Sequence, residues 1–412
     1  MAADTASMAT AIRRVVRTVA IETLGVRDVG GDDDLQRLGL DSLIATILAV
    51  SLQEELGIHV PLAVVLEHPV VDDLVRVIQD GDDRAPTSTE VRLDYNESPI
   101  GPPPRAVAEL RERAGDLHRY PRDLEPEVTR EVAAHFGVDP GDVLLTNGVD
   151  EAVDLLLHDV AEIWTVAPGF DGYAQRAAVH DRAVHTIPLD DRWQPVAPPL
   201  AFAGSRAVFL AQPNNPTGNL FPRAWVEEVT AVADLVFLDE TYLEFSDSPS
   251  FAPLLRSRPN LVLFKSFSKA FGLAGARLGA LVGATQRIAP LRERRAFYSV
   301  DSLSLASVAG ALADADHRAE LKRHMAGART AYLDALRSSE VFAEVRDTQT
   351  NFLLARCPTP QHSAAVTDRL AQQGVRVRRC ADFGLPQWIR VSIGSYEALD
   401  ALSNALARLR LP

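Results

Sequence analysis

The apolar residues of the first eighty positions recur every three or four residues, which is the spacing of amphipathic helices. Ile12, Val16 and Val19 begin this pattern, and Gly25 ends its first part. The spacing predicts helices over residues 12–24, 42–56 and 71–78. Three amphipathic helices in so short a segment predict a small all-α bundle.

Beyond Leu93 the pattern changes to short apolar runs separated by helical stretches, such as residues 151–158 and 225–233. This alternation predicts an α/β domain with a parallel or mixed sheet, whose ligand binds at the carboxyl ends of the strands. The runs expected to form buried strands are residues 143–145, 163–166, 208–210, 235–238 and 261–264.

Charge and composition separate the two parts further. The chain has 412 residues, of which 47% are hydrophobic, enough for more than one folding unit with a large core. Residues 1–82 contain 14 acidic side chains and 6 arginines, so −8 of the net charge of −14 lies there. An acidic chain is a poor partner for nucleic acid or an anionic membrane. The polar segment around Pro86 is expected to be a linker.

The cysteines and the N-terminus limit the compartment and the kinds of site. Cys357 and Cys380 are too few for a disulfide framework or a cysteine-rich metal site. The first residues lack the apolar stretch of an export signal, and no apolar run is long enough to cross a membrane. We therefore expect a cytoplasmic protein without a metal site.

A serine stands at the expected start of the second helix, in the string Leu38-Gly39-Leu40-Asp41-Ser42-Leu43. Taken alone, Asp41 or Ser42 would be an ordinary helix cap. The surroundings add a long preceding helix, an acidic loop at residues 32–34 and the string Leu56-Gly57-Ile58-His59-Val60-Pro61. With these features, residues 8–80 resemble an acyl or peptidyl carrier protein domain.

That resemblance implies a covalent 4′-phosphopantetheine group on Ser42, whose thiol would hold an acyl chain as a thioester. The expected partners are a phosphopantetheinyl transferase, whose basic surface would suit the acidic carrier, and acyl-loading or downstream synthase enzymes.

Lysine is scarce, since Lys265, Lys269 and Lys322 are the only three in the chain. Any mechanism that binds an aldehyde as a Schiff base must use one of them. Lys269 lies just after an apolar run, in the glycine-rich string Ser266-Phe267-Ser268-Lys269-Ala270-Phe271-Gly272-Leu273-Ala274-Gly275-Ala276-Arg277. Hydroxyls, a lysine and an arginine in such a turn suit a cofactor with an aldehyde and a phosphate.

Other polar strings follow apolar runs in a matching order: Ala211-Gln212-Pro213-Asn214-Asn215-Pro216-Thr217-Gly218, and then Asp239-Glu240-Thr241-Tyr242. Singly they would be turns or caps. With the lysine string they resemble the fold-type I pyridoxal-phosphate aminotransferases (class I/II), most closely the histidinol-phosphate aminotransferase branch. The segments 93–102, 119–121 and 390–394 extend the resemblance over residues 92–410.

The resemblance implies roles for the residues around the cofactor ring. Lys269 would bind the aldehyde of pyridoxal 5′-phosphate and then act as the base. Asp239 would pair with the ring nitrogen, Asn215 and Tyr242 would bond the phenolic oxygen, and Phe170 would stack on the ring face.

Further roles concern the anionic groups. Arg390 would bind the substrate carboxylate, and Arg378 the distal end of the substrate. Tyr120 would reach the phosphate from the neighbouring subunit, which implies a homodimer with shared active sites. The other phosphate-binding residues would be Gly148, Val149, Ser266, Ser268 and Arg277.

The expected organisation is therefore a carrier domain over residues 1–80, a linker over 81–91 and a fold-type I enzyme over 92–412. Within the enzyme we expect a large cofactor domain at about residues 121–299. A smaller α+β domain would combine residues 92–120 with 300–412.

A flexible linker of ten residues spans about 18 Å and gives an effective concentration on the order of millimolar. We expect an aminotransferase that moves an amino group from an amino acid to a carbonyl of the acyl chain on Ser42, in a polyketide or nonribosomal-peptide type pathway. The histidinol-phosphate reaction itself needs no carrier, and Gln212 stands where that branch usually has asparagine.

Several alternatives stay open. The carrier could serve a separate synthase. A decarboxylase could use the same motifs, and an α-oxoamine synthase would condense the acyl thioester with an amino acid, although that branch has histidine where Tyr242 stands. An inactive scaffold is opposed by the intact Lys269 and Asp239.

Overall fold

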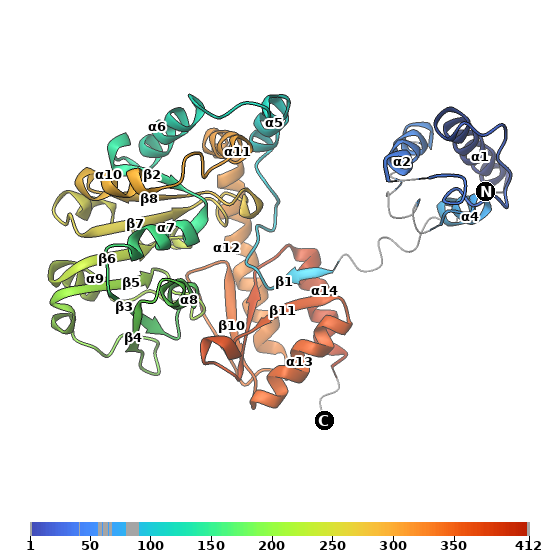
Figure 1. Ribbon diagram of the computed structural model, residues 1–412. Helices are drawn as coiled ribbons and strands as arrows, with labels where there is room; N and C mark the ends of the chain where they lie inside the picture. The colour runs from blue at the N-terminus through green and yellow to red at the C-terminus, as the bar shows by residue number, and fades with distance from the viewer. Residues whose placement is uncertain are drawn as a thin grey trace. The chain divides into compact units, whose positions relative to one another are not determined.

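The computed structural model describes residues 2–40, 42–56, 60, 65, 68–79 and 90–409. The chain divides into two compact units, Met1–Thr89 and Glu90–Pro412, and Figure 1 shows the elements of each. Asp41, Gly57 and most of the expected linker lie outside the described residues.

The first unit is a helical bundle, as the sequence predicts. Its helices are α1 (Ala2–Leu24), α2 (Ser42–Leu56) and α4 (Val71–Gln79). The backbone N–H of Leu35 donates to the carbonyl of Pro69 at 2.9 Å, which fixes the loop after α1 beside the start of α4. The bundle buries an apolar core that includes Ile12, Val16, Val19, Leu48, Leu52, Leu74, Val75 and Ile78.

The second unit contains a seven-stranded sheet in the order β2-β8-β7-β6-β5-β3-β4. All neighbouring strands are parallel except at β8, which is antiparallel to both β7 and β2. The segment between β7 and β8 holds Lys269 and has no crossover helix, so the chain returns beside β7 in the opposite direction. The strands are β2 (Val143–Thr146), β3 (Glu162–Ala167), β4 (Ala183–Pro188), β5 (Gly204–Ala211), β6 (Ala233–Asp239), β7 (Leu261–Ser266) and β8 (Gly279–Gly283).

The five expected strands are confirmed as β2, β3, β5, β6 and β7, whereas β4 and β8 had no clear signal in the sequence. Two separate apolar clusters pack around this sheet. Val208 and Phe209 are neighbours on β5 but belong to different clusters, because successive side chains of a strand point to opposite faces. The helices of this part are α6 (Leu124–Phe136), α7 (Gly148–Leu157), α8 (Gly172–Val179), α9 (Arg223–Val232) and α10 (Thr285–Arg294).

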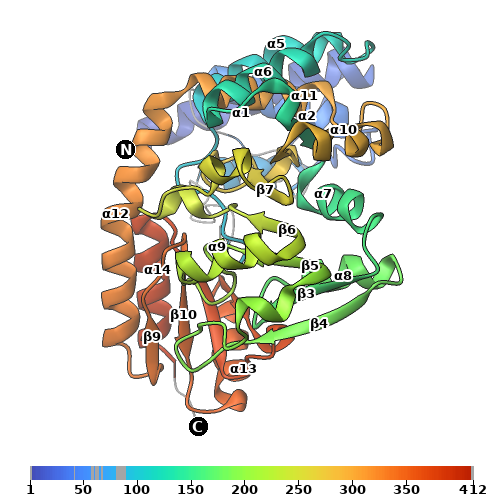
Figure 2. The same ribbon diagram turned by 90° about the vertical axis from the view of Figure 1, so that its left-hand side faces the viewer.

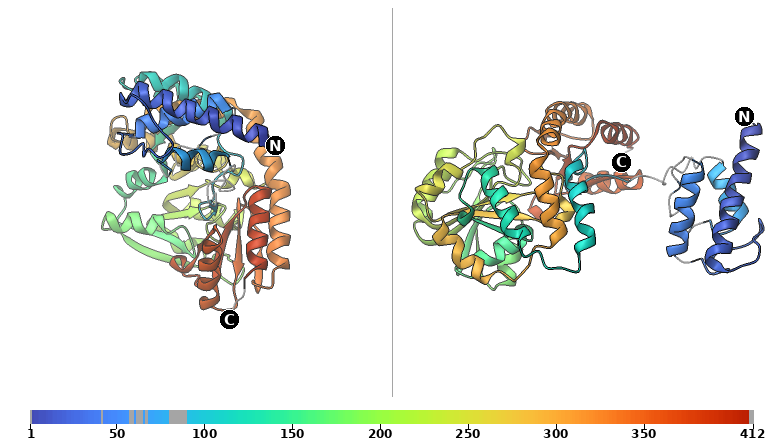
Figure 3. Two further views of the ribbon diagram at one scale, coloured as in Figure 1. Left: turned by 90° about the vertical axis from the view of Figure 1, so that its right-hand side faces the viewer. Right: turned by 90° about the horizontal axis from the view of Figure 1, so that it is seen from above.

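Helix α11 (Ser302–Ala313) lies beside both α5 (Pro104–Arg113) and α6 (Figure 3). Ala106 of α5 and Leu305 of α11 belong to the apolar core of the seven-stranded sheet. A Cβ at Gly310 would lie 2.6 Å from Ala106 Cα, so the glycine permits this close approach. Both helices therefore pack with the large sheet, which corrects their expected assignment to the small domain.

The small domain has five strands in the order β1-β11-β12-β10-β9. The long helix α12 (Ala315–Ser338) runs beside this sheet (Figure 2) and contributes Leu321, Met325 and Tyr332 to its core. The remaining elements are β1 (Val91–Leu93), β9 (Glu344–Arg346), β10 (Phe352–Arg356), α13 (Pro360–Gln372), β11 (Val375–Arg379), β12 (Trp388–Ser392) and α14 (Tyr396–Ala407).

Strand β1 joins this sheet by parallel pairing with β11, in the register Leu93 to Val377. Residues 94–98 therefore follow directly from the small sheet. Short 3-10 segments complete the unit at residues 114–116, 140–142, 199–202, 243–245, 252–256, 274–276 and 381–383. Across the described part of the chain, no helix combines the length and apolarity needed to cross a membrane.

Candidate active site

A cavity of about 460 Å³ opens beside the carboxyl ends of β5, β6 and β7. This is the edge where parallel α/β sheets bind ligands. Its lining combines side chains from the large sheet with residues 94–96 and with Arg378 and Arg390 from the small sheet. The expected site residues in this lining are Val149, Phe170, Asn215, Asp239, Tyr242, Ser266, Ser268, Lys269, Arg277, Arg378 and Arg390.

Lys269 lies in the turn after β7, three residues beyond the end of the strand. Its Nζ donates to the carbonyl oxygen of Tyr95 at 2.6 Å. Burial lowers the pKa of Lys269 to about 8, and the nearby Arg390 and Arg277 guanidiniums act in the same direction. About a tenth of the lysine is therefore a neutral amine at pH 7, far more than for an ordinary lysine, and this is the form that attacks an aldehyde or accepts a proton.

Asp239 is the last residue of β6 and is buried. Its Oδ1 accepts from the backbone N–H of Thr241 and its Oδ2 from the hydroxyl of Tyr173, both at 2.9 Å. Burial raises the pKa of Asp239, and these hydrogen bonds oppose that effect. The carboxylate is thus fixed in direction and supported in its charged form.

Tyr242 directly precedes the 3-10 segment 243–245 after β6 and is buried. Its hydroxyl accepts from Asn96 Nδ2 at 3.0 Å, and burial raises the pKa of Tyr242. Asn96 is itself held by Ser392, whose hydroxyl donates to Asn96 Oδ1 at 2.9 Å. The position of the Tyr242 hydroxyl is therefore fixed by Asn96, which comes from the first residues of the enzyme unit.

Arg390 of β12 is a buried cation without an acidic partner among the described residues. Its Nη1 donates to Asn215 Oδ1 and its Nη2 to the carbonyl of Asp94, each at 2.7 Å. Its Nε is buried, and no described atom accepts from it. A buried donor without a partner is costly, so this side of the guanidinium suits a carboxylate ligand.

Arg378 lines the same cavity but differs from Arg390 in its partner. Its Nη2 donates to Asp382 Oδ2 at 3.0 Å, and its guanidinium lies over the ring of Phe383 at 5.6 Å. Phe383 is also 6.0 Å from the Arg390 guanidinium, so the aromatic ring is close to both cations. The two arginines are thus close enough to bind two ends of one substrate.

The expected phosphate site forms where α7 begins. Gly148, at a φ of 71°, opens this ten-residue helix, and a Cβ there would lie 2.8 Å from Arg277 Nη2. Arg277 also has a positive φ, 51°, and its Nη2 lies 3.5 Å from Asp150 Oδ2. Backbone N–H groups at a helix start, an arginine and the hydroxyls of Ser266 and Ser268 make a suitable set of donors for a phosphate.

Phe170 also lines the cavity, and the structure shows why it is held there. Its ring meets the ring of Tyr173 edge-on, with centroids 5.1 Å apart. A Cβ at Gly172 would lie 2.4 Å from the Phe170 ring, so a larger residue there would displace this ring. The stacking of Phe170 on a cofactor ring stays a prediction.

Tyr120 is outside this lining and is 73% exposed. Its ring stacks on that of Tyr298, with centroids 4.8 Å apart. The expectation that Tyr120 completes the site of a second subunit therefore stays a prediction.

Three residues matter here that the sequence did not single out. Tyr173 and Thr241 hold Asp239, and Asn96 holds Tyr242. Asn96 and Thr241 lie inside strings or segments that resemble the family, and Tyr173 follows Phe170 by three residues. Their partners are distant in sequence or depend on a backbone turn. Gln212 has a different role: its side chain bonds the backbone N–H and carbonyl of Phe221 at 2.9 and 3.1 Å. Gln212 therefore holds the backbone of the loop at Phe221, and its difference from asparagine gives no information about the substrate.

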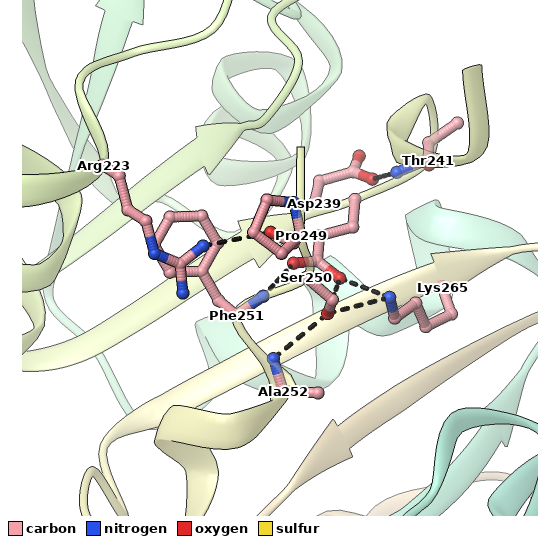
Figure 4. Close-up of polar contacts among 9 residues, drawn as sticks. Arg223, Asp239, Thr241, Pro249, Ser250, Phe251, Ala252 and Lys265 are labelled. Carbon is pink, nitrogen blue, oxygen red and sulfur yellow. Dashed lines mark hydrogen bonds and ion pairs between the residues drawn. The ribbon is translucent and has the colours of Figure 1, made fainter. Parts of the chain in front are cut away.

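A buried ion pair ties the ends of β6 and β7 together near the site. Glu240 Oε2 is bonded to Lys265 Nζ, and both side chains are almost completely buried. Glu240 also accepts from the hydroxyl of Ser250 at 2.7 Å and from the backbone N–H of Phe251 at 2.8 Å. Figure 4 shows Lys265 directed toward Ser250, while Asp239 bonds to Thr241. The pair thus links the strand that ends in Asp239 to the strand that leads to Lys269.

Comparison with known proteins agrees with this site. The sequence profile of the family "Aminotransferase class I and II" matches residues 88–406, and "Phosphopantetheine attachment site" matches residues 14–78. A histidinol-phosphate aminotransferase of Symbiobacterium thermophilum is 35% identical over 332 residues, which covers 77% of this chain and 90% of the relative.

Solved structures give the same result. Histidinol-phosphate aminotransferase from Sinorhizobium meliloti, in complex with pyridoxal 5′-phosphate, superposes with a TM-score of 0.69 at 26% identity, covering 77% of this chain and 89% of that one. L-threonine-O-3-phosphate decarboxylase from Porphyromonas gingivalis shares the fold at 20% identity, with a TM-score of 0.66 over 77% of this chain and 98% of that one.

Fold and site therefore define a pyridoxal-phosphate-dependent transferase. The chain belongs to the class I and II aminotransferase family, and a phosphopantetheine carrier domain precedes its enzyme domain. Its cofactors are accordingly pyridoxal 5′-phosphate and 4′-phosphopantetheine.

Proposed function

We propose that this protein transfers an amino group from an amino acid to a carbonyl of an acyl chain tethered through phosphopantetheine to Ser42. Such a reaction belongs to natural-product biosynthesis of the polyketide or nonribosomal-peptide type. One observation carries the proposal: a carrier domain shares a single chain with an enzyme domain whose cavity gathers Lys269, Asp239, Tyr242 and Arg390.

The residues of the cavity divide the chemistry among them. When bound, pyridoxal 5′-phosphate supplies an aldehyde that takes up the amino group and a ring that withdraws electrons. Lys269, with its lowered pKa, supplies a neutral amine that moves a proton to and from the substrate Cα. Asp239 would hold the ring nitrogen protonated, and Arg390, which lines the cavity, would bind the donor carboxylate.

The proposal includes a homodimer, with Tyr120 of each subunit contributing to the other subunit's phosphate site. The high exposure of Tyr120 and its stacking on the partly exposed Tyr298 support this, because both rings are available to a second copy. The partners would include a phosphopantetheinyl transferase and acyl-loading or downstream enzymes. Two buried free thiols, Cys357 and Cys380, suit a reducing cytoplasm.

A second candidate is a decarboxylase or a decarboxylative condensing enzyme that acts on the same tethered group. The fold shared with L-threonine-O-3-phosphate decarboxylase favours keeping this candidate. Against the condensing reaction stands Tyr242, at the position where α-oxoamine synthases have histidine. Because relatives of this chain are named histidinol-phosphate aminotransferase, histidinol phosphate must be among the substrates tested.

A spectroscopic titration of the purified, cofactor-loaded protein tests the proposal. We expect L-glutamate or another amino acid to remove the visible band of the lysine-bound cofactor and produce the near-ultraviolet band of the aminated cofactor. Conversion by an amino acid, together with no turnover of histidinol phosphate, would support a carrier-linked aminotransferase. A visible band that persists with every amino acid would favour decarboxylation or condensation instead.

Replacement of Ser42 tests the carrier half separately. We expect Ser42→Ala to gain no mass when incubated with coenzyme A and a phosphopantetheinyl transferase, because the attachment hydroxyl is gone. Ser51→Ala removes a hydroxyl nine residues further along α2 and is the matched control, which should still be modified. A mass gain in Ser42→Ala would move the arm to another residue. The amino-acid titration should be unchanged in both variants.

A further inference from the structure

Tyr173 lies on α8 and has no measurable exposure to solvent. Its hydroxyl donates to Asp239 Oδ2 at 2.9 Å. Aromatic rings surround the tyrosine ring edge-on: Phe170, Phe237 and Phe209 have centroids at 5.1, 5.7 and 6.0 Å. Packing of this kind leaves the side chain one position, so the hydroxyl has a fixed direction toward the carboxylate.

Asp239 needs such a donor because its surroundings oppose its charge. It is buried, and the adjacent Glu240 carboxylate adds a like charge, so both raise the pKa of Asp239. Donors from Thr241 and Tyr173 act in the opposite direction. Burial and the nearby Asp239 carboxylate also raise the pKa of Tyr173 well above its usual value, so the phenol keeps its proton and stays a donor.

We propose that Tyr173 is a positioning residue that holds Asp239 as an oriented carboxylate toward the ring nitrogen of the cofactor. This inference rests on the proposed function, which assigns the ring nitrogen to Asp239. The phenol proton stays on Tyr173, and the ring proton stays between the ring nitrogen and Asp239, so no proton is consumed. A carboxylate held in this way keeps the ring positively charged and a better acceptor of electrons.

Tyr173 also contacts Phe170, the residue expected at the face of the cofactor ring. Phe170 precedes it by three residues. Gly172 between them leaves room for the Phe170 ring, which an added Cβ would displace. One short segment therefore positions the side chain at the ring face and the donor behind the ring nitrogen.

Tyr173→Phe in the cofactor-loaded protein tests the inference. Without the phenol, Asp239 becomes more basic and takes a larger share of the ring proton. Loss of positive charge on the ring makes the nitrogen that joins the cofactor to Lys269 easier to protonate. We expect the pH midpoint of the visible absorbance change to rise by about one pH unit, and the cofactor dissociation constant to rise about tenfold.

Tyr332→Phe is the matched control. Tyr332 is a buried tyrosine of the small domain whose hydroxyl donates to the carbonyl of Ser395 at 3.0 Å, away from the cavity lining. This variant should keep the wild-type midpoint and cofactor affinity. A wild-type midpoint and affinity in Tyr173→Phe would overturn the inference while the proposed function stands. Failure of the wild type to bind the cofactor at Lys269 would instead overturn the proposed function.

A second measurement covers the case in which Tyr173→Phe does not fold. Incorporation of 3-fluorotyrosine at position 173 keeps the shape of the side chain and makes the phenol a stronger donor. The pH midpoint should then fall, opposite to the effect of phenylalanine. A midpoint that does not change, or that rises, would contradict the inference.

Discussion

Lys269→Ala should abolish the visible band of the bound cofactor and lower amino transfer by about a thousandfold or more, since it removes both the attachment point and the base. The reason is local: Lys269 is the one lysine in the cavity lining. Lys265 is already engaged in a buried ion pair with Glu240 and cannot replace it. Absorbance, and the mass of the peptide that retains cofactor after borohydride reduction, measure the outcome.

Lys322→Ala is the control for this experiment, because Lys322 is exposed on α12. It should keep the visible band and the labelled peptide around residue 269. A reducible, cofactor-labelled Lys269→Ala protein would instead assign attachment to Lys265 or Lys322.

The pKa of Lys269 adds a pH dependence to the same test. Only the neutral amine attacks the aldehyde, so the rate of cofactor attachment to the cofactor-free protein should rise with pH and level off above about 8. Below that value each pH unit should lower the rate about tenfold. A midpoint near the ordinary lysine pKa would mean that Lys269 is not desolvated in solution.

Lys265→Ala should lower the free energy of unfolding of the enzyme domain by about 3–5 kcal/mol. The variant leaves Glu240 charged and buried without its cationic partner, and two remaining donors, from Ser250 and Phe251, only partly compensate. All four tryptophans, at positions 164, 193, 225 and 388, belong to this unit, so their fluorescence follows its unfolding without signal from the carrier.

Two variants make the test specific to burial. Arg294→Ala breaks the partly exposed pair between Arg294 and Asp159 and should cost no more than about 1 kcal/mol. The double replacement Lys265→Met with Glu240→Gln removes both charges, keeps an acceptor for Ser250 and Phe251, and should recover most of the lost stability. A loss below about 1 kcal/mol in Lys265→Ala would mean that water reaches the pair.

A loss of stability of this size would also affect the position of the active-site residues. Glu240 directly follows Asp239, and Lys265 lies four residues before Lys269. The ion pair therefore helps to hold together the two strand ends that carry these residues, in addition to the parallel ladder between β6 and β7. Cofactor affinity should accordingly fall together with stability in Lys265→Ala and recover in the double variant.

The features that could be predicted from the sequence are those that depend on local order. Helical spacing predicted the helical bundle, and apolar runs predicted five central strands. The resemblance to known families, carried by short strings just beyond those runs, singled out Lys269 and Asp239 as expected site residues. These features could be predicted because helix period, strand pattern and the polar residues at strand ends are set by neighbours within a few positions.

Contacts between residues that are distant in sequence could not be predicted and are seen in the folded protein. Asn96 and Ser392 are 296 positions apart and hydrogen bonded, and Arg390 reaches Asn215 across 175 positions. Helices α5 and α11 pack closely on each other because Gly310 leaves room for Ala106. The hydroxyl of Tyr173 bonds Asp239 because the aromatic rings packed around Tyr173 fix its direction. Such pairs depend on how whole sheets and helices pack, and local propensity carries no information about that packing.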